Sequence, residues 1–579
     1  MAAGLSTIGP GGVWIQALAV GTGRQVGRQW ARLPLHRLTL IGIGDLAAAP
    51  KDHRPADLAA GRLLLAGRFV LAGQTVDVGD GGDPWDRPSP SLQFAAALHR
   101  MDWLRDLEAT GPEGAVAALR LTLSWSRLFG RGNRFSWRGD ILPRRVFNLA
   151  CAADLICARA SDLERGRILR DLARQAQALL LVSEGTGQAA SRAVAAGVAG
   201  AALSGPAGGG LLRSALGRLE RLLPLAVAAD GGHATRSPEA ALDLLLDLMT
   251  LDAALSERGM ETPRSLLRTI DRLTGSVRFF TLADGMLADM QGGGAGREGQ
   301  VAAALGGQAG KPPVARNGYQ RLDGRGLQVL VDAAAPAQGA WSLAACAQPL
   351  AITVLSGDRR LIVGCAWTPV SGAPQALRMV DGASTLSVGD QACGGPLRGL
   401  RAAGLGPRLV DAYQAVEQRR HEADGALWLE LSHDGWVKGF QLRHERRLYL
   451  DVAADELRGE DCLSPCGDIV AGAGSRFVPF TVRFHLHPDV TASLALDGHS
   501  VLLKVEGQDT AWWLRNDAKE VALEPSVYIQ DGQPRRTMQV VLRGQARLDA
   551  GAKVRWKLTA AEAGAAAPKE AIDRRVSAA

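Results

Sequence analysis

A chain of 579 residues is too long for one hydrophobic core, so we expect two or more domains. Its 47% hydrophobic and 22% charged residues are typical of globular proteins, and no apolar stretch is long enough to form a transmembrane segment. The net charge of +7 could favour a polyanionic partner, or it could simply reflect an arginine-rich composition. The basic residues are scattered along the chain, which argues against nucleic acid as that partner.

The first domain is predicted to be helical. Residues 1–60 are irregular and form a lead-in, and from 61 to 290 apolar residues recur with the helical period. Ser161 and Glu164 make a capping box for a helix over 161–182, and Pro238 opens a largely apolar helix over 238–258. Further helices are predicted over 96–108, 113–129, 140–158, 211–225 and 263–280, and the Gly-Pro pair at 205–206 should divide 193–210 between two helices. Short links between consecutive helices predict helical hairpins that close into an α/α-toroid.

The second domain is predicted to consist of β-strands. Residues 291–316 are rich in glycine and proline and read as a linker, and the period then changes to two over 317–560. This pattern predicts a C-terminal antiparallel β-sandwich, followed by a flexible, alanine-rich tail over 561–579. Strands are expected over 327–331, 351–355, 360–366, 426–431, 436–442, 447–452, 477–487, 500–505 and 538–542. The seven cysteines fit no zinc module, although Cys462 and Cys466 could pair.

Two segments near the domain junction could carry chemistry. His233 and Arg236 lie in a glycine-containing loop just before the helix at Pro238, where a helix N-terminus favours anions, so they could grip a carboxylate. An ordinary capping loop is the alternative. Tyr319 follows the linker and could act as an acid or base, or it could simply pack between the domains.

Two further groups are candidates for binding. Trp137, Arg144 and Arg145 belong to a tryptophan- and arginine-rich stretch that would suit acidic sugars or ordinary helix packing. On the strand at 477–487, alternation puts His485, His487 and Arg483 on one face. The two histidines could share a zinc ion, but the spacing identifies no third ligand, so a metal-free role stays open.

Several segments in chain order together resemble the bacterial heparinase II/III-like proteins. They are Phe69-Val-Leu-Ala-Gly, the 230–238 loop, Gly318-Tyr-Gln-Arg-Leu, Arg360-Leu-Ile-Val-Gly-Cys, Arg447-Leu-Tyr-Leu and Arg483-Phe-His-Leu-His-Pro. The resemblance implies the same toroid and sandwich, and lyase chemistry on acidic polysaccharide. In β-elimination the uronate carboxylate is neutralised before a base removes the C5 proton.

The resemblance also implies residue roles. It matches His233 and Arg236 to carboxylate neutralisation and Tyr319 to the acid–base step, with His485 and His487 at the site or on zinc. Arg144, Arg145, Trp137 and Arg483 would then bind the substrate. Family members commonly act in the periplasm or cell envelope, whereas no signal peptide is recognised here, which leaves the cytoplasm as the alternative. The polymer and the oligomeric state are not specified by the sequence.

The chain departs from the family pattern at four positions. Cys346 and Ala383 stand where the resemblance places histidines, Gly364 stands where asparagine is usual, and Gln291 stands where Phe-Asn-Gly is common. A thiol can replace imidazole as a zinc ligand but is a poor base unless its pKa is lowered. The alternative function is therefore a catalytically inactive relative that binds acidic glycan or assists envelope polysaccharide metabolism.

Overall fold

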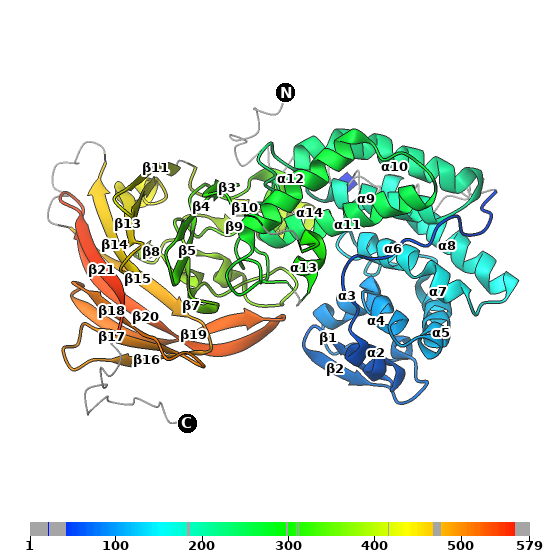
Figure 1. The fold of residues 1–579 in the computed structure, drawn as a ribbon, viewed down its shortest axis with the longest axis horizontal. Coiled ribbons are helices and arrows are strands. Elements are labelled where there is room, and N and C mark those ends of the chain that lie inside the picture. The colour runs from blue at the N-terminus through cyan, green and yellow to red at the C-terminus, as the bar shows by residue number, and fades with distance from the viewer. Residues whose placement is uncertain are drawn as a thin grey trace.

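The computed structural model describes residues 21–22, 42–181, 186–296, 299–307, 310, 312–414, 416–466 and 476–561. Figure 1 shows a helical domain at one end of the molecule and stacked β-sheets at the other. The predicted combination of an N-terminal helical part and C-terminal antiparallel sheets is confirmed. The predicted tail over 561–579, apart from residue 561, and most of the predicted lead-in over 1–60 lie outside the described residues.

The helical domain is built from consecutive helices in short-linked pairs. Its elements are α2 (Leu58–Leu65), the hairpin β1 (Arg68–Leu71) and β2 (Gln74–Asp77), α3 (Leu92–Arg100), α4 (Leu104–Glu108), α5 (Pro112–Phe129), α6 (Leu142–Cys151), α7 (Ala153–Cys157), α8 (Asp162–Leu181), α9 (Ala189–Ala202), α10 (Gly205–Ala226), α11 (Pro238–Glu257) and α12 (Arg264–Phe280). A short helix, α13 (Gln300–Leu305), follows within the predicted linker. Among the described helices, none is long and apolar enough to cross a membrane.

Local sequence signals explain where these helices begin and break. The Ser237 hydroxyl accepts from the Ala240 amide and Pro238 occupies the first turn, so α11 begins where the sequence predicts. The Glu164 carboxylate accepts from the Ser161 amide, which completes the capping box of α8. The predicted break at 205–206 separates α9 from α10. The 96–108 helix is divided in two because Met101 adopts a left-handed φ of 61°.

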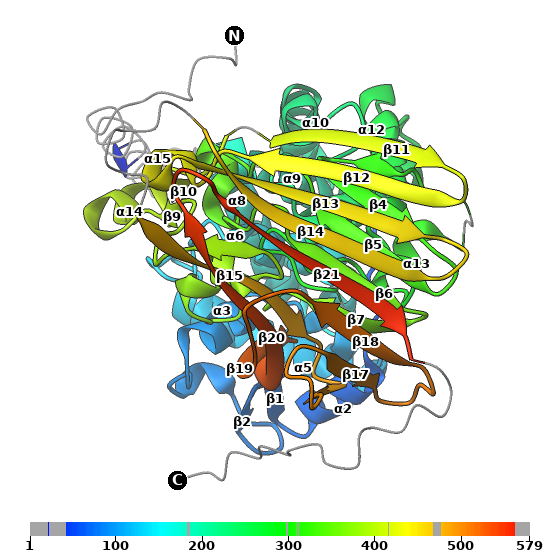
Figure 2. The ribbon, with the colours of Figure 1, turned by 90° about the vertical axis from the view of Figure 1, so that its left-hand side faces the viewer.

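Two large antiparallel sheets form most of the C-terminal domain, beside a two-stranded sheet of β9 (Gly395–Pro396) and β10 (Leu409–Val410). The nine-stranded sheet has the order β19 (Glu520–Gln530), β20 (Gln533–Arg547), β15 (Phe477–Leu486), β7 (Arg359–Val363), β6 (Ile352–Ser356), β5 (Leu327–Asp332), β4 (Tyr319–Asp323) and β3 (Ala315–Arg316), with β8 (Leu386–Val388) beside β15. The eight-stranded sheet has the order β11 (Val416–Ala423), β12 (Ala426–His433), β13 (Leu442–Asp451), β14 (Glu456–Pro465), β21 (Ala552–Ala560), β18 (Ala511–Asn516), β17 (Val501–Val505) and β16 (Val490–Leu494). Figure 2 shows the eight-stranded sheet from its outer side.

Strands β4 to β7 of the nine-stranded sheet are buried on both faces, because they lie between the helices and the second sheet. Leu322 and Val329 face the sandwich core, where Phe484 packs 4.9 Å from Trp556 of the other sheet. The opposite face of β4 and β5 packs on the helical core, to which Tyr319 and Leu330 belong. This burial makes the domain junction a continuous interior, with no solvent layer between the two halves at these strands.

One predicted strand in the β domain is wrong, and one possible cysteine pair is not formed. Residues 436–442 form the four-residue helix α15 (Val437–Phe440), because the segment bonds to itself: the Val437 amide donates to the Asp434 oxygen and the Phe440 amide to that of Trp436. Glycines at 435 and 439 weaken the expected strand. Cys462 and Cys466 are not paired, since both are free thiols.

Candidate functional site

The predicted site loop holds the two domains together. The guanidinium of Arg236 lies 2.6 Å from the Asp332 carboxylate at the end of β5, and both side chains are buried. The same guanidinium donates to four main-chain oxygens of the β domain, those of Asn317, Gly318, Ala334 and Ala335. These contacts use all five N–H donors of the guanidinium, so Arg236 is placed to join the domains and has no donor left for a substrate carboxylate.

Tyr319 is a packed core residue in this arrangement. Its ring is fully buried, lies edge-on to Phe280, and is covered by the Arg236 guanidinium 4.7 Å from the ring centre. The hydroxyl donates to the main-chain oxygen of Arg236. Burial, reinforced by the nearby Asp332 carboxylate, raises the pKa of Tyr319 well above its ordinary value. The hydroxyl reaches no open surface, so its position does not support the predicted acid–base role.

His233 is also enclosed. Its Nδ1 lies 2.7 Å from the Thr235 hydroxyl, and its ring stands edge-on to Trp341. Burial lowers the pKa of His233 to about 4, so the imidazole is neutral near pH 7. A neutral ring cannot neutralise a substrate carboxylate by charge, which removes the electrostatic part of the predicted role.

The residues predicted to bind sugars are engaged inside the helical domain. Arg145 is fully buried, donates to the Gln175 side chain, and covers Trp125 at 4.4 Å. Arg144 is ion-paired with Asp247 at 2.7 Å. Trp137 is partly buried against the helical core. These contacts agree with the helix-packing alternative for the tryptophan- and arginine-rich stretch.

The two strand histidines do not converge on one point. His485 Nδ1 lies 2.7 Å from the Ser526 hydroxyl, and its Nε2 lies 3.0 Å from the Asp381 main-chain oxygen. His487 instead packs edge-on against Tyr528, with ring centroids 5.0 Å apart. No cluster of three or more candidate metal ligands occurs within the described ranges. Both nitrogens of His485 already have protein partners, so the pair does not fit a zinc ion in this geometry.

Arg483, the remaining predicted binding residue, lies on the same strand. Its guanidinium donates to the Ser387 hydroxyl at 2.7 Å and pairs with the Asp381 carboxylate at 2.8 Å. The Arg483 side chain is 20% exposed, whereas that of Asp381 is 63% exposed. Arg483, like the other predicted binding residues, therefore already has partners within the protein.

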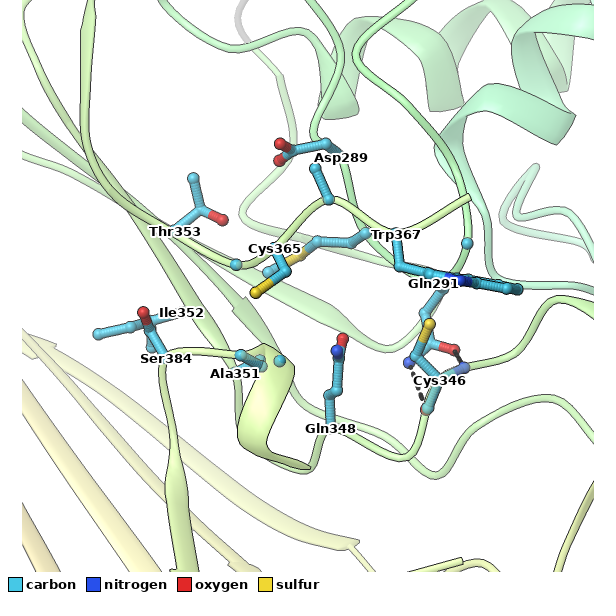
Figure 3. Close-up of a pocket in the computed structure, with 16 residues that line it drawn as sticks. Asp289, Gln291, Cys346, Gln348, Ala351, Ile352, Thr353, Cys365, Trp367 and Ser384 are labelled. Atoms are coloured by element: carbon cyan, nitrogen blue, oxygen red, sulfur yellow. Dashed lines mark hydrogen bonds between the residues drawn. The ribbon is translucent and has the colours of Figure 1, made fainter. Parts of the chain in front are cut away.

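All four departures from the family pattern line one cavity at the domain junction. Sixteen residues surround it, among them Gln291, Cys346, Gly364 and Ala383 (Figure 3). The Gln291 side chain spans its wall, where its oxygen accepts from the Cys346 amide at 3.0 Å and its amide donates to the Cys346 main-chain oxygen at 3.2 Å. The four positions at which the sequence departs from the family pattern therefore lie together in the structure, whereas the residues predicted to be catalytic do not line this cavity.

The cavity is small, and its lining is a mixture of polar and apolar groups. Its volume is about 20 Å³, which is enough for a water molecule and far too little for a sugar ring. Two buried oxygens in its wall, Asp289 Oδ1 and Thr353 Oγ1, have no protein hydrogen-bond partner.

The ionisable groups around the cavity are not usable bases near pH 7. Burial raises the pKa of the Cys346 thiol to about 12 and that of Cys365 to about 11. Burial also lowers the pKa of His485, which lies 3.8 Å from the Cys365 sulfur, to about 4. The Asp289 carboxylate is paired with Arg360 at 3.1 Å. Proton abstraction from a sugar would need both an accessible base and room for the ring, and this arrangement supplies neither.

Sequence reasoning missed the cluster that closes this side of the junction. Arg360 of β7 contacts Asp284 at 2.7 Å, and the Tyr528 hydroxyl donates to Asp289 at 2.7 Å. Tyr528 comes from β19, more than two hundred residues beyond Asp289. Charge alternation along the chain carries no signal for such a contact, because its members come from three segments that are far apart in the sequence.

Comparison with known proteins shows which family this chain resembles. Residues 308–557 match the family described as Heparinase II/III-like, C-terminal. A relative from Caulobacter vibrioides (strain NA1000 / CB15N), FtsZ-localized protein C, is 46% identical over 560 residues, which cover 95% of this chain and 97% of the relative. The chain belongs to the heparinase II/III-like family.

Solved structures share the fold across both domains. Heparinase III superposes with a TM-score of 0.64 at 14% identity, over 87% of this chain and 84% of that one. Heparan sulfate lyase HepC from Pedobacter heparinus gives a TM-score of 0.53 at 13% identity, over 94% of this chain and 90% of that one. At these identities the likeness establishes the architecture of this heparinase II/III-like protein and leaves its activity to the residues described above.

Proposed function

We propose that this protein is a non-catalytic member of the heparinase II/III-like family that works together with FtsZ assemblies. The fold is that of a polysaccharide lyase-like protein, and a relative 46% identical along nearly the whole chain carries FtsZ localisation in its name. In this proposal the lyase architecture serves as a rigid two-domain scaffold, and the protein resides where FtsZ does instead of in the periplasm.

The small volume of the junction cavity is the observation that supports the proposed loss of catalysis. With a volume of about 20 Å³ it cannot admit a uronate ring, and Gln291 bridges across it to Cys346. The candidates for carboxylate neutralisation and proton transfer, Arg236 and Tyr319, bond to each other and to the β domain. Opening a substrate site would require breaking the contacts that join the domains.

An elimination assay tests this part of the proposal. The purified protein is incubated with heparan sulfate, heparin and other uronate polymers, and the ultraviolet absorbance of the unsaturated product is followed, with an active heparinase III as positive control. We expect no product above the protein-free rate. Product release that disappears in Tyr319→Phe would instead establish a working lyase and overturn the proposal.

Imaging tests the second part. A fluorescent fusion of the full chain is followed in the cells that encode it, together with labelled FtsZ, before and after FtsZ depletion. We expect the fusion to coincide with FtsZ and to disperse when FtsZ is removed. A fusion whose position is unaffected by FtsZ depletion would contradict the proposed association, whatever the outcome of the elimination assay.

A further inference from the structure

A second, much larger hollow lies on the outer face of the eight-stranded sheet, far from the junction cavity. It has a volume of about 580 Å³, within the range of ligand-binding pockets. β12, β13, β14, β21 and β18, which lie side by side in Figure 2, supply its lining. Its floor is main chain, because Leu448, Gly459 and Trp556 are cross-strand neighbours and the Leu448 and Trp556 side chains are buried in the core.

One wall of the hollow is a cross-strand row with aromatic residues at one end and cations at the other. The ladder registers place Trp428 opposite Tyr449, Tyr449 opposite Arg458, Arg458 opposite Lys557, and Lys557 opposite Arg515. Residues opposite one another in antiparallel strands project on the same face. We call this set the aromatic–cationic row.

The cations of this row keep much of their capacity for a ligand. The side chains of Arg458 and Lys557 are 58% and 40% exposed, and both rely on the same carboxylate, that of Glu456. Arg515 has no carboxylate within ion-pairing distance among the described residues, and its bonds there are to the Thr559 hydroxyl and the Trp513 ring. Among the described residues, these three cations therefore have one carboxylate partner between them. A carboxylate from a partner could bridge them without displacing a separate internal carboxylate from each.

The opposite wall has mixed charge. Glu430 is opposite Arg447, Arg447 opposite Glu460, and Glu460 opposite Arg555. With Asp517, the hollow is lined by three carboxylates and by five basic side chains. The lining is therefore net positive. Its three carboxylates would nevertheless repel a polymer that carries a negative charge on every repeat.

The aromatic rings are not free platforms for flat rings. Trp428 and Tyr449 meet at 63°, and the guanidinium of Arg458 covers Tyr449 at 5.3 Å. His421 lies against Trp428 with centroids 5.6 Å apart. These contacts disfavour stacking of sugars or bases, but they leave ring edges that an aliphatic or aromatic side chain can contact.

We propose that this hollow binds an extended polypeptide segment that combines acidic residues with at least one apolar side chain. The carboxylates bind along Arg458, Lys557 and Arg515, and the apolar side chain packs beside Trp428 and Tyr449. From Trp428 to Arg515 the row crosses five strands, or about 19 Å at the usual strand spacing. That length corresponds to about six extended residues. The inference concerns a surface separate from the junction cavity and does not depend on the loss of catalysis.

Fluorescence anisotropy with a defined probe tests the proposal. The probe is a labelled peptide of about eight residues that alternates Asp and Glu with Leu and Phe. Its matched control replaces each acid by Asn or Gln. With the full chain we expect saturable binding of the acidic probe that weakens as salt rises, and binding at least roughly tenfold weaker for the amide control. Equal binding of both peptides, or none at millimolar protein, would overturn the proposal.

Charge reversal locates the binding. The double variant Arg458→Glu with Lys557→Glu should weaken probe binding by roughly tenfold or more. The matched control, Arg68→Glu with Arg359→Glu, reverses two cations that are 54% and 51% exposed on other surfaces and should leave binding unchanged. Equal effects of both double variants would show non-specific attraction and refute the site. A heparin oligosaccharide that binds through Arg458 and Lys557 more tightly than the peptide would replace the polypeptide by a polysaccharide as the occupant.

Discussion

Truncation of Arg236 to alanine should be among the most destabilising single changes in this protein. The guanidinium supplies the only ion pair that the structure shows for the 3%-exposed Asp332 side chain, at 2.6 Å, and also serves four main-chain oxygens. Alanine is preferred to glycine because Arg236 has a φ of 62°, where glycine would relax the backbone and confuse the comparison.

The expected loss in the free energy of unfolding is about 3–5 kcal/mol, which is the usual cost of removing one partner from a buried ion pair. The Gln291 amide still donates to Asp332 at 2.8 Å in the variant, which favours the lower end of this range. Removing Asp332 as well should recover part of the loss, because no buried charge is then left unpaired.

The effect is measured by urea unfolding. Circular dichroism monitors the helices, and tryptophan fluorescence monitors both domains. Two probes are needed because the domains can separate before either unfolds. Arg68→Ala, which breaks an exposed contact of 4.0 Å to Asp77, is the control and should cost less than about 1 kcal/mol. A loss for Arg236→Ala no larger than that of the control would refute the junction role assigned to this residue.

Three further predictions use other parts of the molecule. Gly459→Ala should destabilise by about 1–3 kcal/mol, because a Cβ there would lie 2.1 Å from the Trp556 ring, whereas Gly217→Ala, with open space in α10, should stabilise by about 0.5–1 kcal/mol; urea midpoints check both. Cys346 should resist iodoacetamide in the native protein and react after unfolding, because its thiol is buried and its pKa is raised to about 12. Labelling is measured by peptide mass spectrometry, and rapid labelling of Cys346 in the native protein would contradict the prediction. Burial lowers the pKa of His485 to about 4 in the folded state, so the unfolded chain takes up this proton first and stability should fall as pH drops from about 6.5 to about 4. Because His233 has a similarly lowered pKa, His485→Asn should reduce the slope of the pH–stability curve in this range without abolishing it, and an unchanged slope would contradict the assignment.

Much of the fold follows from local signals. The change of period after residue 291 marks the change from helices to strands, and the caps at Ser161 and Ser237 set helix starts. These features depend on residues a few positions apart, so they are legible along the chain. The failed strand over 436–442 shows the limit, since a short glycine-containing segment can alternate by chance and still bond to itself.

The candidate site could be placed but not interpreted from the sequence. Gln291, Cys346 and Ala383 were singled out by their departure from a family pattern, and the structure gathers them around one cavity. The roles proposed for Tyr319 and Arg236 depended on exposure, which spacing does not encode. Exposure is decided by what packs above a residue, and here that is the other domain.

The sequence by itself determined the order of helices and strands, the domain junction and the family, because hydrophobic period, capping residues and segment identity are properties of neighbouring residues. Only the tertiary structure decided that Arg236 faces Asp332, 96 residues away, and that the junction is closed around a water-sized cavity. It also brought Trp428, Tyr449 and Arg515 into one row on the outer sheet. Pairing between distant segments depends on sheet register and domain packing, which are fixed by the whole chain at once.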